Sequence, residues 1–462
     1  MKAKALALTR SLNPFRRRRP AFRAEALPAI AVPAGNIGVL SGPDEFRTTL
    51  LELIARATRR IVLVALYLQD DDAGREVLAA LHAARARNPE LKVQVLVDWH
   101  RAQRGLIGKD RSEGNAALYR EYAGRLGAGV EIYGVPVQNR ELFGVLHLKG
   151  FVIDDTVLYS GASINDVYLA RHGRYRLDRY HRLDSPALAD CLVEFVAREL
   201  IAKDAVCRLD VPNVPTTRAI AGAIREFRQG MSAARYRFAA QACAADDVAV
   251  TPLVGLGRDD NELNRTLVEL IRATKQRLVI LTPYFNLPRE IRVALARLLR
   301  QGCEVTIVVG DKTANDFFIP PSEPFKTIGL LPYLYEANLR RFAKVHARDI
   351  ADGKLNIHLW RDGDNSYHLK GLFIDDDISV VTGNNLNPRA WALDLENALV
   401  LRDPAGRLKE KNAAELAALL KQAKRLPDFH ALETPRHYPA PVRKLFKRLN
   451  RVRLDRLVNR LL

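Results

Sequence analysis

The sequence is poor in cysteine and lacks the cysteine patterns of disulfide scaffolds and metal sites. Its four cysteines, Cys191, Cys207, Cys243 and Cys303, lie far apart among 462 residues, without CxxC pairs or the Cys/His spacing of zinc sites. This spacing excludes a small disulfide-stapled domain and favours a reduced, cytoplasmic protein with incidental thiols.

Long apolar runs are also absent. The best run, IVLVALYL at residues 61–68, is far shorter than the roughly 18–20 residues that cross a bilayer, so we expect no membrane-spanning segment. The first twenty residues lack the apolar stretch and small-residue cleavage site of a secretion signal. Their arginine content also fits an organelle transit peptide, but we favour a basic surface arm.

Acidic residues are missing from the start of the chain and nearly missing from its end. Residues 1–23 hold eight Lys and Arg and no acid, and residues 436–462 hold nine against Asp455. The two ends account for +16 of the formal net charge of +19, so the rest of the chain carries +3. A body of ordinary charge with two basic ends indicates an anionic partner, either nucleic acid or anionic lipid.

The chain is long enough for two domains, and it repeats itself. HLKGFVIDD at residues 147–155 returns as HLKGLFIDDD at residues 368–377. Two further pairs occur in the same order: ARATRRIVLVALYL (55–68) with IRATKQRLVILTPYF (271–285), and LKVQVLVDW (91–99) with CEVTIVVGD (303–311). Three matches in one order predict a duplicated domain.

Within each copy, strand-like apolar runs alternate with helical stretches such as residues 76–87 and 289–302. This alternation predicts an α/β fold of two α/β/α sandwich domains, whose sheets are covered on both faces. The expected parts are a basic arm at 1–37, domains at 38–205 and 245–432, a connector at 206–244 and a basic amphipathic helix at 433–462.

The longest match has the form HxKxxxxD in each copy. Its chemical residues are His147, Lys149 and Asp154 in the first copy and His368, Lys370 and Asp375 in the second. Residues two apart in a strand point to the same face, so the histidine and lysine can reach one small anionic group. Lysine is a poor metal ligand at neutral pH and a good phosphate partner. The pattern therefore favours a phosphate site that needs no metal or cofactor.

A second shared string follows each motif, GASIN at 161–165 and GNNLN at 383–387. Glycine permits a tight turn beside the histidines, and Asn165 and Asn387 offer amide donors to phosphoryl oxygens. Seven residues rather than six separate the motif aspartate from the glycine in the second copy, which leaves its donor positions less well defined.

Two acids lie farther along, Asp178 in LDRYH and Asp394 in LDLEN. Each is a candidate to hold an imidazole by a hydrogen bond. A surface salt bridge is equally compatible with their spacing.

The doubled HxKxxxxD with its GxxxN string resembles the phospholipase D superfamily, in which two such motifs form one active site across a pseudo-twofold interface. Other strings, among them VLVDWHRAQRG, TPYFNLP and TGNNLNPRAWALDLENA, resemble the phosphatidylserine synthases of Gram-negative bacteria. The resemblance implies a transferase of phospholipid biosynthesis. Such an enzyme moves the phosphatidyl group of CDP-diacylglycerol to the hydroxyl of L-serine and releases CMP.

The resemblance also implies a mechanism with two histidines. One attacks phosphorus and forms a phosphatidyl-histidine, and the other protonates the departing CMP and later takes the proton of serine. The superfamily pattern makes His147 the nucleophile and His368 the acid/base, although the near symmetry of the repeat leaves their order open. The donors expected around the phosphate are Lys149, Lys370, Asn165 and Asn387.

Other residues receive supporting roles by the same resemblance. The motif aspartates Asp154 and Asp375 are expected to be more structural than chemical. The expected supporting acids are Asp178, Asp394 and Glu396, with Asp178 and Asp394 the candidates for orienting the histidines.

Substrate specificity is expected in two loops, DWHRAQRG at 98–105 and GDKTANDFF at 310–318. They occupy equivalent positions after a strand, where α/β folds place ligand-binding loops. We expect Arg101 and Arg104, or Lys312, to meet the diphosphate of CDP, with ordinary loop polarity as the alternative.

Residues 442–462 have apolar side chains at helical spacing, beginning with Val442, Leu445 and Phe446, and carry eight Lys and Arg. Such a helix suits an anionic membrane surface, so we expect a cytoplasmic protein bound peripherally to the inner face of the cell membrane. The alternative is a helix docked on the protein's own body. Residues 329–342 are a second candidate for membrane contact or, equally, a buried helix.

Three competing functions remain. A nuclease of the same superfamily would also be basic, but the apolar face of the terminal helix has no role on DNA. A cardiolipin-synthase-like enzyme would use the same chemistry on another acceptor, although members of that group commonly begin with membrane-spanning segments. A non-catalytic membrane-binding protein is disfavoured by two intact motifs.

Overall fold

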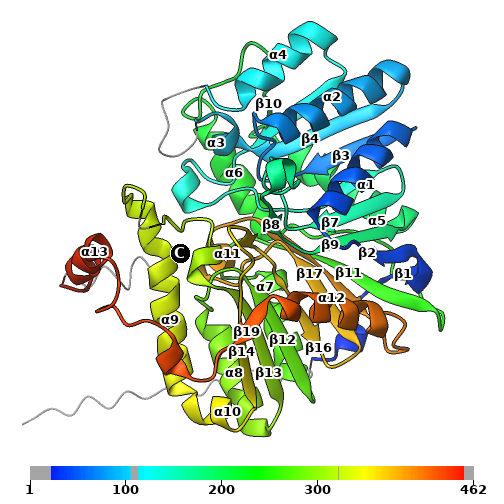
Figure 1. The fold of residues 1–462 in the computed structure, drawn as a ribbon. Helices are drawn as coiled ribbons and strands as arrows, with labels where there is room; N and C mark the ends of the chain where they lie inside the picture. Colours follow the sequence, from blue (N-terminus) through cyan, green and yellow to red (C-terminus); the bar gives the residue numbers. More distant parts are fainter. Residues whose placement is uncertain (1–21, 106–112, 321, 452–462) are drawn as a thin grey trace, which may run out of the picture.

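The computed structural model describes residues 22–105, 113–320 and 322–451, which fold into two α/β halves, each built on its own sheet (Figure 1). Residues 1–21 and 452–462 lie outside the described residues. The expectations for a basic N-terminal arm and for the last turns of the C-terminal helix therefore stay predictions.

The first half contains an eight-stranded sheet whose central strands β3, β4 and β5 are parallel, while the other pairings are antiparallel. In spatial order its strands are β10 (Cys207–Arg208), β5 (Val130–Val135), β4 (Lys92–Asp98), β3 (Arg60–Val64), β6 (Phe151–Ile153), β7 (Thr156–Ser160), β9 (Tyr180–Asp184) and β2 (Ile37–Val39).

The second half repeats this plan in a nine-stranded sheet with parallel strands β12, β13 and β14. In spatial order its strands are β1 (Ile30–Pro33), β11 (Asp247–Gly255), β18 (Glu396–Arg402), β17 (Ile378–Thr382), β16 (Gly371–Ile374), β12 (Arg277–Thr282), β13 (Glu304–Gly310), β14 (Leu355–Trp360) and β19 (Ala423–Arg425).

Helices connect the strands and cover the sheets (Figure 1). In the first half and the connector they are α1 (Pro43–Arg56), α2 (Asp72–Arg87), α3 (Trp99–Ala102), α4 (Ala116–Leu126), α5 (Pro186–Phe195) with a π-helical turn at Val196–Ile201, and α6 (Ala221–Ser232). In the second half they are α7 (Glu262–Ala273), α8 (Arg289–Gln301), α9 (Leu331–Val345), α10 (Ala347–Ala351), α11 (Pro388–Ala392), α12 (Lys409–Lys421) and α13 (Ala440–Arg451). Short 3₁₀ turns are η1 (Ala24–Ala26), η2 (Ala34–Asn36), η3 (Glu141–Phe143), η4 (Arg171–Gly173), η6 (Lys312–Ala314), η7 (Thr327–Leu330) and η8 (Phe429–Ala431).

Strand β3 shows why its sequence is a continuous apolar run. Ile61 and Leu63 face an apolar cluster formed with α1 and α2, whereas Val62 and Val64 face a cluster shared by the two halves. Side chains alternate along a strand, so a sheet buried on both faces needs apolar residues at every position. The shared cluster also contains Leu399 of β18, and it joins the two sheets into one body.

A two-stranded parallel sheet also joins the halves. It pairs β8 (Arg176–Leu177) of the first half with β15 (Ser366–Tyr367) of the second, directly before His368. A matching parallel bridge pairs Leu146, directly before His147, with Leu395 of the second half. Each HxK segment therefore lies beside a strand from the other half.

The expected domain limits fall within structured segments. Residues 30–39 form an edge strand in each sheet, because β1 pairs with β11 and β2 pairs with β9. In the expected connector, β10 extends the first sheet and α6 contributes Phe227 to the shared cluster.

The start of the C-terminal helix departs from the expectation of a membrane-facing apolar stripe. Val442 and Phe446 are 1% and 7% exposed, and they pack against Leu330 and Tyr333. The reason is that η7 and the start of α9 present apolar and aromatic side chains that this stripe covers. Four basic side chains of α13 remain exposed: Arg443, Lys444, Lys447 and Arg448. Within the described ranges no helix is long and apolar enough to cross a bilayer.

Candidate active site

The first HxK segment is held by residues of the second half. The His147 N–H donates to the Leu395 carbonyl at 2.9 Å. Asn397 then accepts from the Lys149 N–H through Oδ1 and donates to the Lys149 carbonyl through Nδ2, both at 2.8 Å. These bonds keep the segment extended, so His147 and Lys149 project to the same side.

The second HxK segment is held by the first half in the corresponding way. The His368 N–H donates to the Leu177 carbonyl at 2.8 Å, continuing the pairing of β15 with β8. Arg179 follows two residues later, and its Nη1 donates to the Val380 carbonyl at 2.8 Å. The site is therefore complete only when both halves are folded together.

Glycines permit the close approaches that this arrangement requires. A Cβ atom on Gly161 would lie 2.6 Å from both carboxylate oxygens of Asp178. A Cβ atom on Gly383 would lie 2.8 Å from Lys149 Cγ. The shared string after each motif thus begins with glycine because a side chain there would displace a charged group of the site.

His147 is buried beside a carboxyl group of the second half. Its Nδ1 lies 2.9 Å from both Oε1 and Oε2 of Glu396. Burial, followed by the charges of Lys149 and Lys370, holds the pKa of His147 well below its usual value. Burial and the neighbouring Asp394 raise the pKa of Glu396 well above its usual value. The surroundings therefore disfavour an imidazolium at His147.

His368 has a different set of partners. Its Nδ1 lies 3.1 Å from Asp178 Oδ2 and 2.9 Å from the Tyr168 hydroxyl, and it also contacts Lys370 Nζ. Burial and Lys370 lower the pKa of His368 to about 4, although Asp178 acts in the opposite direction. Burial would raise the pKa of Asp178, but Lys370 and His368 outweigh it and hold that pKa below its usual value.

The two lysines also differ. Lys370 Nζ lies 2.8 Å from Asp178 Oδ2, whereas Lys149 Nζ donates to the His147 carbonyl at 3.1 Å. Burial lowers the pKa of Lys149 to about 8, with Glu396 acting in the opposite direction. Because Lys370 and His368 both act on the pKa of His147, the two motifs lie close enough to share one electrostatic environment.

The motif aspartates lie in hairpin turns, where their carboxylates accept hydrogen bonds from backbone N–H groups. Asp154 accepts from the N–H groups of Thr58, Arg59 and Arg60, and Asp375 accepts from those of residues 275–277. Both have positive φ, 50° and 49°, as tight hairpin turns require. The turn after β6 has two residues and the turn after β16 has three. The extra residue of the second copy is therefore absorbed in this turn.

Asn165 and Asn387, the last residues of the two shared strings, cap turns beside the site. Asn165 Oδ1 accepts from the Tyr168 N–H at 3.0 Å, and Asn387 Oδ1 accepts from the Ala390 N–H at 2.9 Å. Capping uses the oxygen and leaves the amide nitrogen as the donor. Asn165 Nδ2 directs that donor toward Gln69 Oε1 at 3.5 Å.

The spacing of Asp394 had made it a candidate to hold His147 by a hydrogen bond, but the structure gives Asp394 other partners. Its Oδ1 accepts from the Val145 N–H at 3.0 Å, and its Oδ2 pairs with Arg389 Nε at 3.2 Å. Glu396, two residues later, takes the position beside the imidazole. The reason is register: Leu177 and Leu395 accept from the two histidine N–H groups, so Glu396 is the counterpart of Asp178.

Arg101, in α3, and Arg104, just after it, lie together beyond the end of β4. Both pair with Glu141 of η3, Arg104 Nη2 at 2.8 Å from Oε1 and Arg101 Nε at 3.4 Å. Arg389 reaches the same turn and donates to the Glu141 carbonyl at 2.9 Å. Three arginines thus gather around η3, and their charge exceeds that of Glu141 and Asp394.

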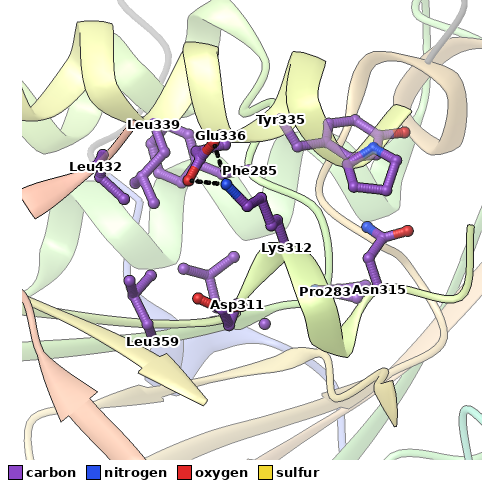
Figure 2. A pocket seen from close by; sticks show the side chains of 13 residues that line it. Pro283, Phe285, Asp311, Lys312, Asn315, Tyr335, Glu336, Leu339, Leu359 and Leu432 are labelled. Atoms are coloured by element: carbon purple, nitrogen blue, oxygen red, sulfur yellow. Dashed lines mark hydrogen bonds and ion pairs between the residues drawn. The ribbon is translucent and has the colours of Figure 1, made fainter. Parts of the chain in front are cut away.

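Lys312 lies elsewhere, in a pocket between the ends of β12 and β13 and helix α9 (Figure 2). Its Nζ is 3.2 Å from Glu336 Oε2 and 2.6 Å from Glu433 Oε2. Two carboxylates therefore neutralise the amino group that the sequence had suggested for diphosphate binding. Tyr335 lines the same pocket and stacks on Tyr284, which in turn meets the His368 ring edge-on.

Several residues of the site were missed by sequence reasoning. Tyr168 and Asn397 contact the motif residues directly, and each lies next to a motif that was recognised, Tyr168 three residues after Asn165 and Asn397 next to Glu396. Asp394 and Glu396 are two apart and share a strand face, so side-chain alternation alone does not choose between them. Tyr284 lies in TPYFNLP, a string that the resemblance singled out, but its proximity to His368 depends on the fold.

One group of side chains in the described part of the chain has metal-binding spacing. The ligand atoms of Asp72, Asp166 and His172 all lie within 4.8 Å of one another. His172 Nε2 is already 2.8 Å from Asp72 Oδ2, and the group is largely exposed. An ion pair accounts for this arrangement, and the chemistry of the two HxK motifs does not use it.

Comparisons with known proteins agree with this geometry. A family model described as "Cardiolipin synthase, PLD-like domain" matches residues 50–166 and 267–422. The chain is 48% identical over 452 residues to the CDP-diacylglycerol–serine O-phosphatidyltransferase PssA of Escherichia coli (strain K12), covering 98% of this chain and 100% of that protein. It is 46% identical over 440 residues to the CDP-diacylglycerol–serine O-phosphatidyltransferase of Haemophilus influenzae, covering 94% and 97%.

A solved structure extends the agreement to the fold. The crystal structure of phosphatidylserine synthase from Haemophilus influenzae Rd KW20 matches with a TM-score of 0.91 at 45% identity, covering 95% of this chain and 98% of that one. The prediction of a mixed α/β protein with two PLD-like halves is confirmed by this match and by the two family-model regions. The chain belongs to the CDP-diacylglycerol–serine O-phosphatidyltransferase family and is built from two PLD-like halves.

Proposed function

We propose that this protein transfers the phosphatidyl group of CDP-diacylglycerol to the hydroxyl of L-serine, with release of CMP, as a transferase of phospholipid biosynthesis. The observation that carries the proposal is the pairing of two HxK motifs across the interface, each with a carboxyl group from the opposite half at its histidine. The relatives named above have this activity in their names.

In the first step, His147 Nε2 attacks the phosphorus of the phosphatidyl group while the P–O bond to CMP breaks. Two features support His147 as the nucleophile. Its low pKa keeps the ring neutral at neutral pH, and Glu396 at Nδ1 can hold the remaining proton there, which leaves the Nε2 lone pair free. His368, stabilised as an imidazolium by the arriving anionic substrate, donates a proton to the departing CMP phosphate and becomes neutral.

In the second step, His368 takes the proton of the serine hydroxyl. The serine oxygen attacks phosphorus, and the P–N bond to His147 breaks. The ionised Asp178 supports this role, because it stabilises the imidazolium that His368 becomes when it accepts a proton. An arriving anionic substrate would stabilise the same imidazolium.

Lys149 and Lys370 supply positive charge beside the reacting phosphate. Phosphodiester oxygens repel a nucleophile until their charge is offset, and preformed donors in a buried site do this without reorganising water. Asn165 and Asn387 add amide donors at the turns that flank the lysines. No step assigned here requires a metal.

The CDP diphosphate would bind at the three arginines around η3. Arg101 and Arg104 are each tied to Glu141, and Arg389 adds a further positive charge to the group. A diphosphate carries more negative charge than Glu141 and offers oxygens for bidentate guanidinium contacts. Replacing Arg101 by Gln should raise the KM for CDP-diacylglycerol about tenfold, and an unchanged KM would remove Arg101 from the site.

The decisive experiment is an incubation of the purified protein with CDP-diacylglycerol, with and without L-serine, followed by mass spectrometry of the products. Phosphatidylserine formed only when serine is present, with equimolar CMP, is the expected result. Phosphatidic acid and CMP formed without phosphatidylserine would show that serine is not the acceptor, and cleavage of DNA in a parallel incubation without lipid turnover would indicate a nuclease.

The lipid substrate also implies contact with a membrane surface. Helix α13 exposes Arg443, Lys444, Lys447 and Arg448 while its apolar residues Val442 and Phe446 are buried in the body. We propose that these charges hold the protein peripherally to anionic lipid at the inner face of the cell membrane. In the described part of this helix, binding would be electrostatic.

Replacing these four basic residues by Gln should weaken binding to vesicles containing phosphatidylglycerol by about 100-fold at low salt, at roughly 1 kcal/mol per charge with partial screening. Vesicle sedimentation measures this. The control is the same fourfold change at exposed Arg292, Arg297, Arg300 and Lys344, which leaves α13 intact. Equal weakening by both sets would refute a specific role for α13.

A further inference from the structure

Arg176 and Asp316 form a largely buried charged pair beside His368, one residue from each half. Arg176 Nη2 lies 3.3 Å from Asp316 Oδ2, and the two side chains are 17% and 9% exposed. Arg176 precedes Asp178 by two residues in an extended segment, so both project to the side on which His368 is held.

Two tyrosines connect this pair to the acid/base histidine. The Arg176 guanidinium lies 4.8 Å over the ring of Tyr168, whose hydroxyl is 2.9 Å from His368 Nδ1. The Tyr284 hydroxyl donates to Asp316 Oδ2 at 2.9 Å, and the Tyr284 ring meets the His368 ring edge-on at 5.9 Å. A small molecule bound at the pair would therefore lie next to His368.

The pair is incompletely satisfied. Among the described residues, Arg176 Nε and Asp316 Oδ1 are buried and have no hydrogen-bond partner. Their mutual contact uses only the other two atoms, Nη2 and Oδ2. A buried charged group with an unused donor or acceptor is costly, and structural ion pairs normally use both. The unused atoms are one cationic donor and one anionic acceptor.

A free amino acid has the complementary groups, a carboxylate and an ammonium on one carbon atom. We propose that Arg176 and Asp316 form the acceptor subsite that selects serine, an inference that rests on the proposed function. Arg176 Nε donates to the serine carboxylate, Asp316 Oδ1 accepts from the serine ammonium group, and the serine hydroxyl is directed toward His368. Water and glycerol lack both charges and gain nothing from the pair.

This subsite explains a requirement of the two-step reaction. Water is small and abundant, so the site must favour serine over water as the acceptor that attacks the phosphatidyl-histidine. A site built to pair with substrate charges rejects acceptors that lack them, because its own buried charges would then remain unpaired. The specificity for an amino acid is thereby located at Arg176 and Asp316, beside the histidine that accepts the hydroxyl proton.

The test compares acceptors within each variant. Full-length Arg176→Gln and Asp316→Asn are assayed with L-serine, with ethanolamine, which lacks the carboxylate, and with 3-hydroxypropanoate, which lacks the ammonium group. Arg176→Gln should reduce the preference for serine over ethanolamine by about 100-fold, and Asp316→Asn should reduce the preference for serine over 3-hydroxypropanoate by a similar factor. Arg174→Gln, an exposed neighbour in the same segment, is the matched control.

A half-reaction separates this proposal from the proposed function. Exchange of labelled CMP into CDP-diacylglycerol needs no acceptor, so wild-type protein without exchange would refute the proposed function. Preferences that stay within twofold of wild type, or a loss equal for all acceptors and for exchange, would overturn the subsite. Arg176→Lys keeps the charge beside Asp316 but removes the Nε donor, so it still tests the subsite if Arg176→Gln does not fold.

Discussion

The two HxK segments have nearly the same sequence, but their histidines have different surroundings. His147 is paired with Glu396, whose pKa is raised by burial, while His368 is paired with Asp178, whose pKa is held down by Lys370. An acid that resists ionisation beside one ring and a stable carboxylate beside the other favour different proton chemistry. The difference shows that the proton chemistry of each histidine depends on the carboxyl group that the opposite half places at its Nδ1.

The largest expected effect is the loss of either histidine. His147→Ala and His368→Ala should each reduce phosphatidylserine formation by about 10⁴-fold or more, because each removes a group that bonds to phosphorus or moves a proton. Covalent labelling separates them. With CDP-diacylglycerol radiolabelled in the phosphatidyl phosphate, His368→Ala should still label slowly, whereas His147→Ala should not label.

Labelling of His147→Ala but not of His368→Ala would reverse the two roles. Near wild-type transfer by both variants would refute the histidine mechanism. His430→Ala is the control, since this histidine is exposed in η8.

The next effect tests the two acids. Asp178→Asn removes a buried anion that faces both His368 and Lys370, so kcat should fall about 10³-fold. Glu396→Gln should cost only about tenfold, because the amide oxygen can still accept from Nδ1 and Glu396 resists ionisation in any case. Steady-state kinetics measure both. Equal losses would contradict the difference that we assign to the two halves.

A smaller effect is expected at the glycines of the two strings. Gly161→Ala forces a methyl group against Asp178, and Gly383→Ala forces one against Lys149. Each should lower the free energy of unfolding by about 1–3 kcal/mol and reduce activity. Thermal denaturation measures the first quantity. Gly124→Ala in α4 has open space around its Cβ and is the control, which should leave stability unchanged or raise it slightly.

The smallest effect is a shift in pH dependence. Lys149 is charged below its pKa of about 8 and loses its proton as the pH rises through that value. The kcat/KM for CDP-diacylglycerol, which reports the free enzyme, should therefore fall above pH 8 in wild type. Lys149→Arg should extend the plateau to higher pH, because arginine stays protonated. Lys92→Arg, an exposed lysine, is the control, and an identical alkaline limb in Lys149→Arg would assign the titration to another group.

Much of the fold could be predicted from local pattern. The apolar run at Ile61–Val64 is continuous because both faces of β3 are buried. The sequence repeat predicted a second buried strand at β12, and both of its faces are also buried. The terminal helix shows the limit of such a prediction. Its amphipathic pattern correctly indicated an apolar face, but much of the surface that covers Val442 and Phe446 is formed by Leu330 and Tyr333, more than one hundred positions earlier.

The candidate site divides in the same way. The sequence by itself determined the two histidines, the two lysines and the glycine of each string, because the repeat marks them twice and the chemistry of a phosphate explains them. Only the tertiary structure decided that Glu396 rather than Asp394 meets His147, and that Arg176 meets Asp316. These are contacts between halves, and they depend on which residues the parallel pairings at Leu177 and Leu395 bring opposite each histidine. The sequence around a residue does not show which residue of the other half lies opposite it, because that register is set by how the two sheets pack.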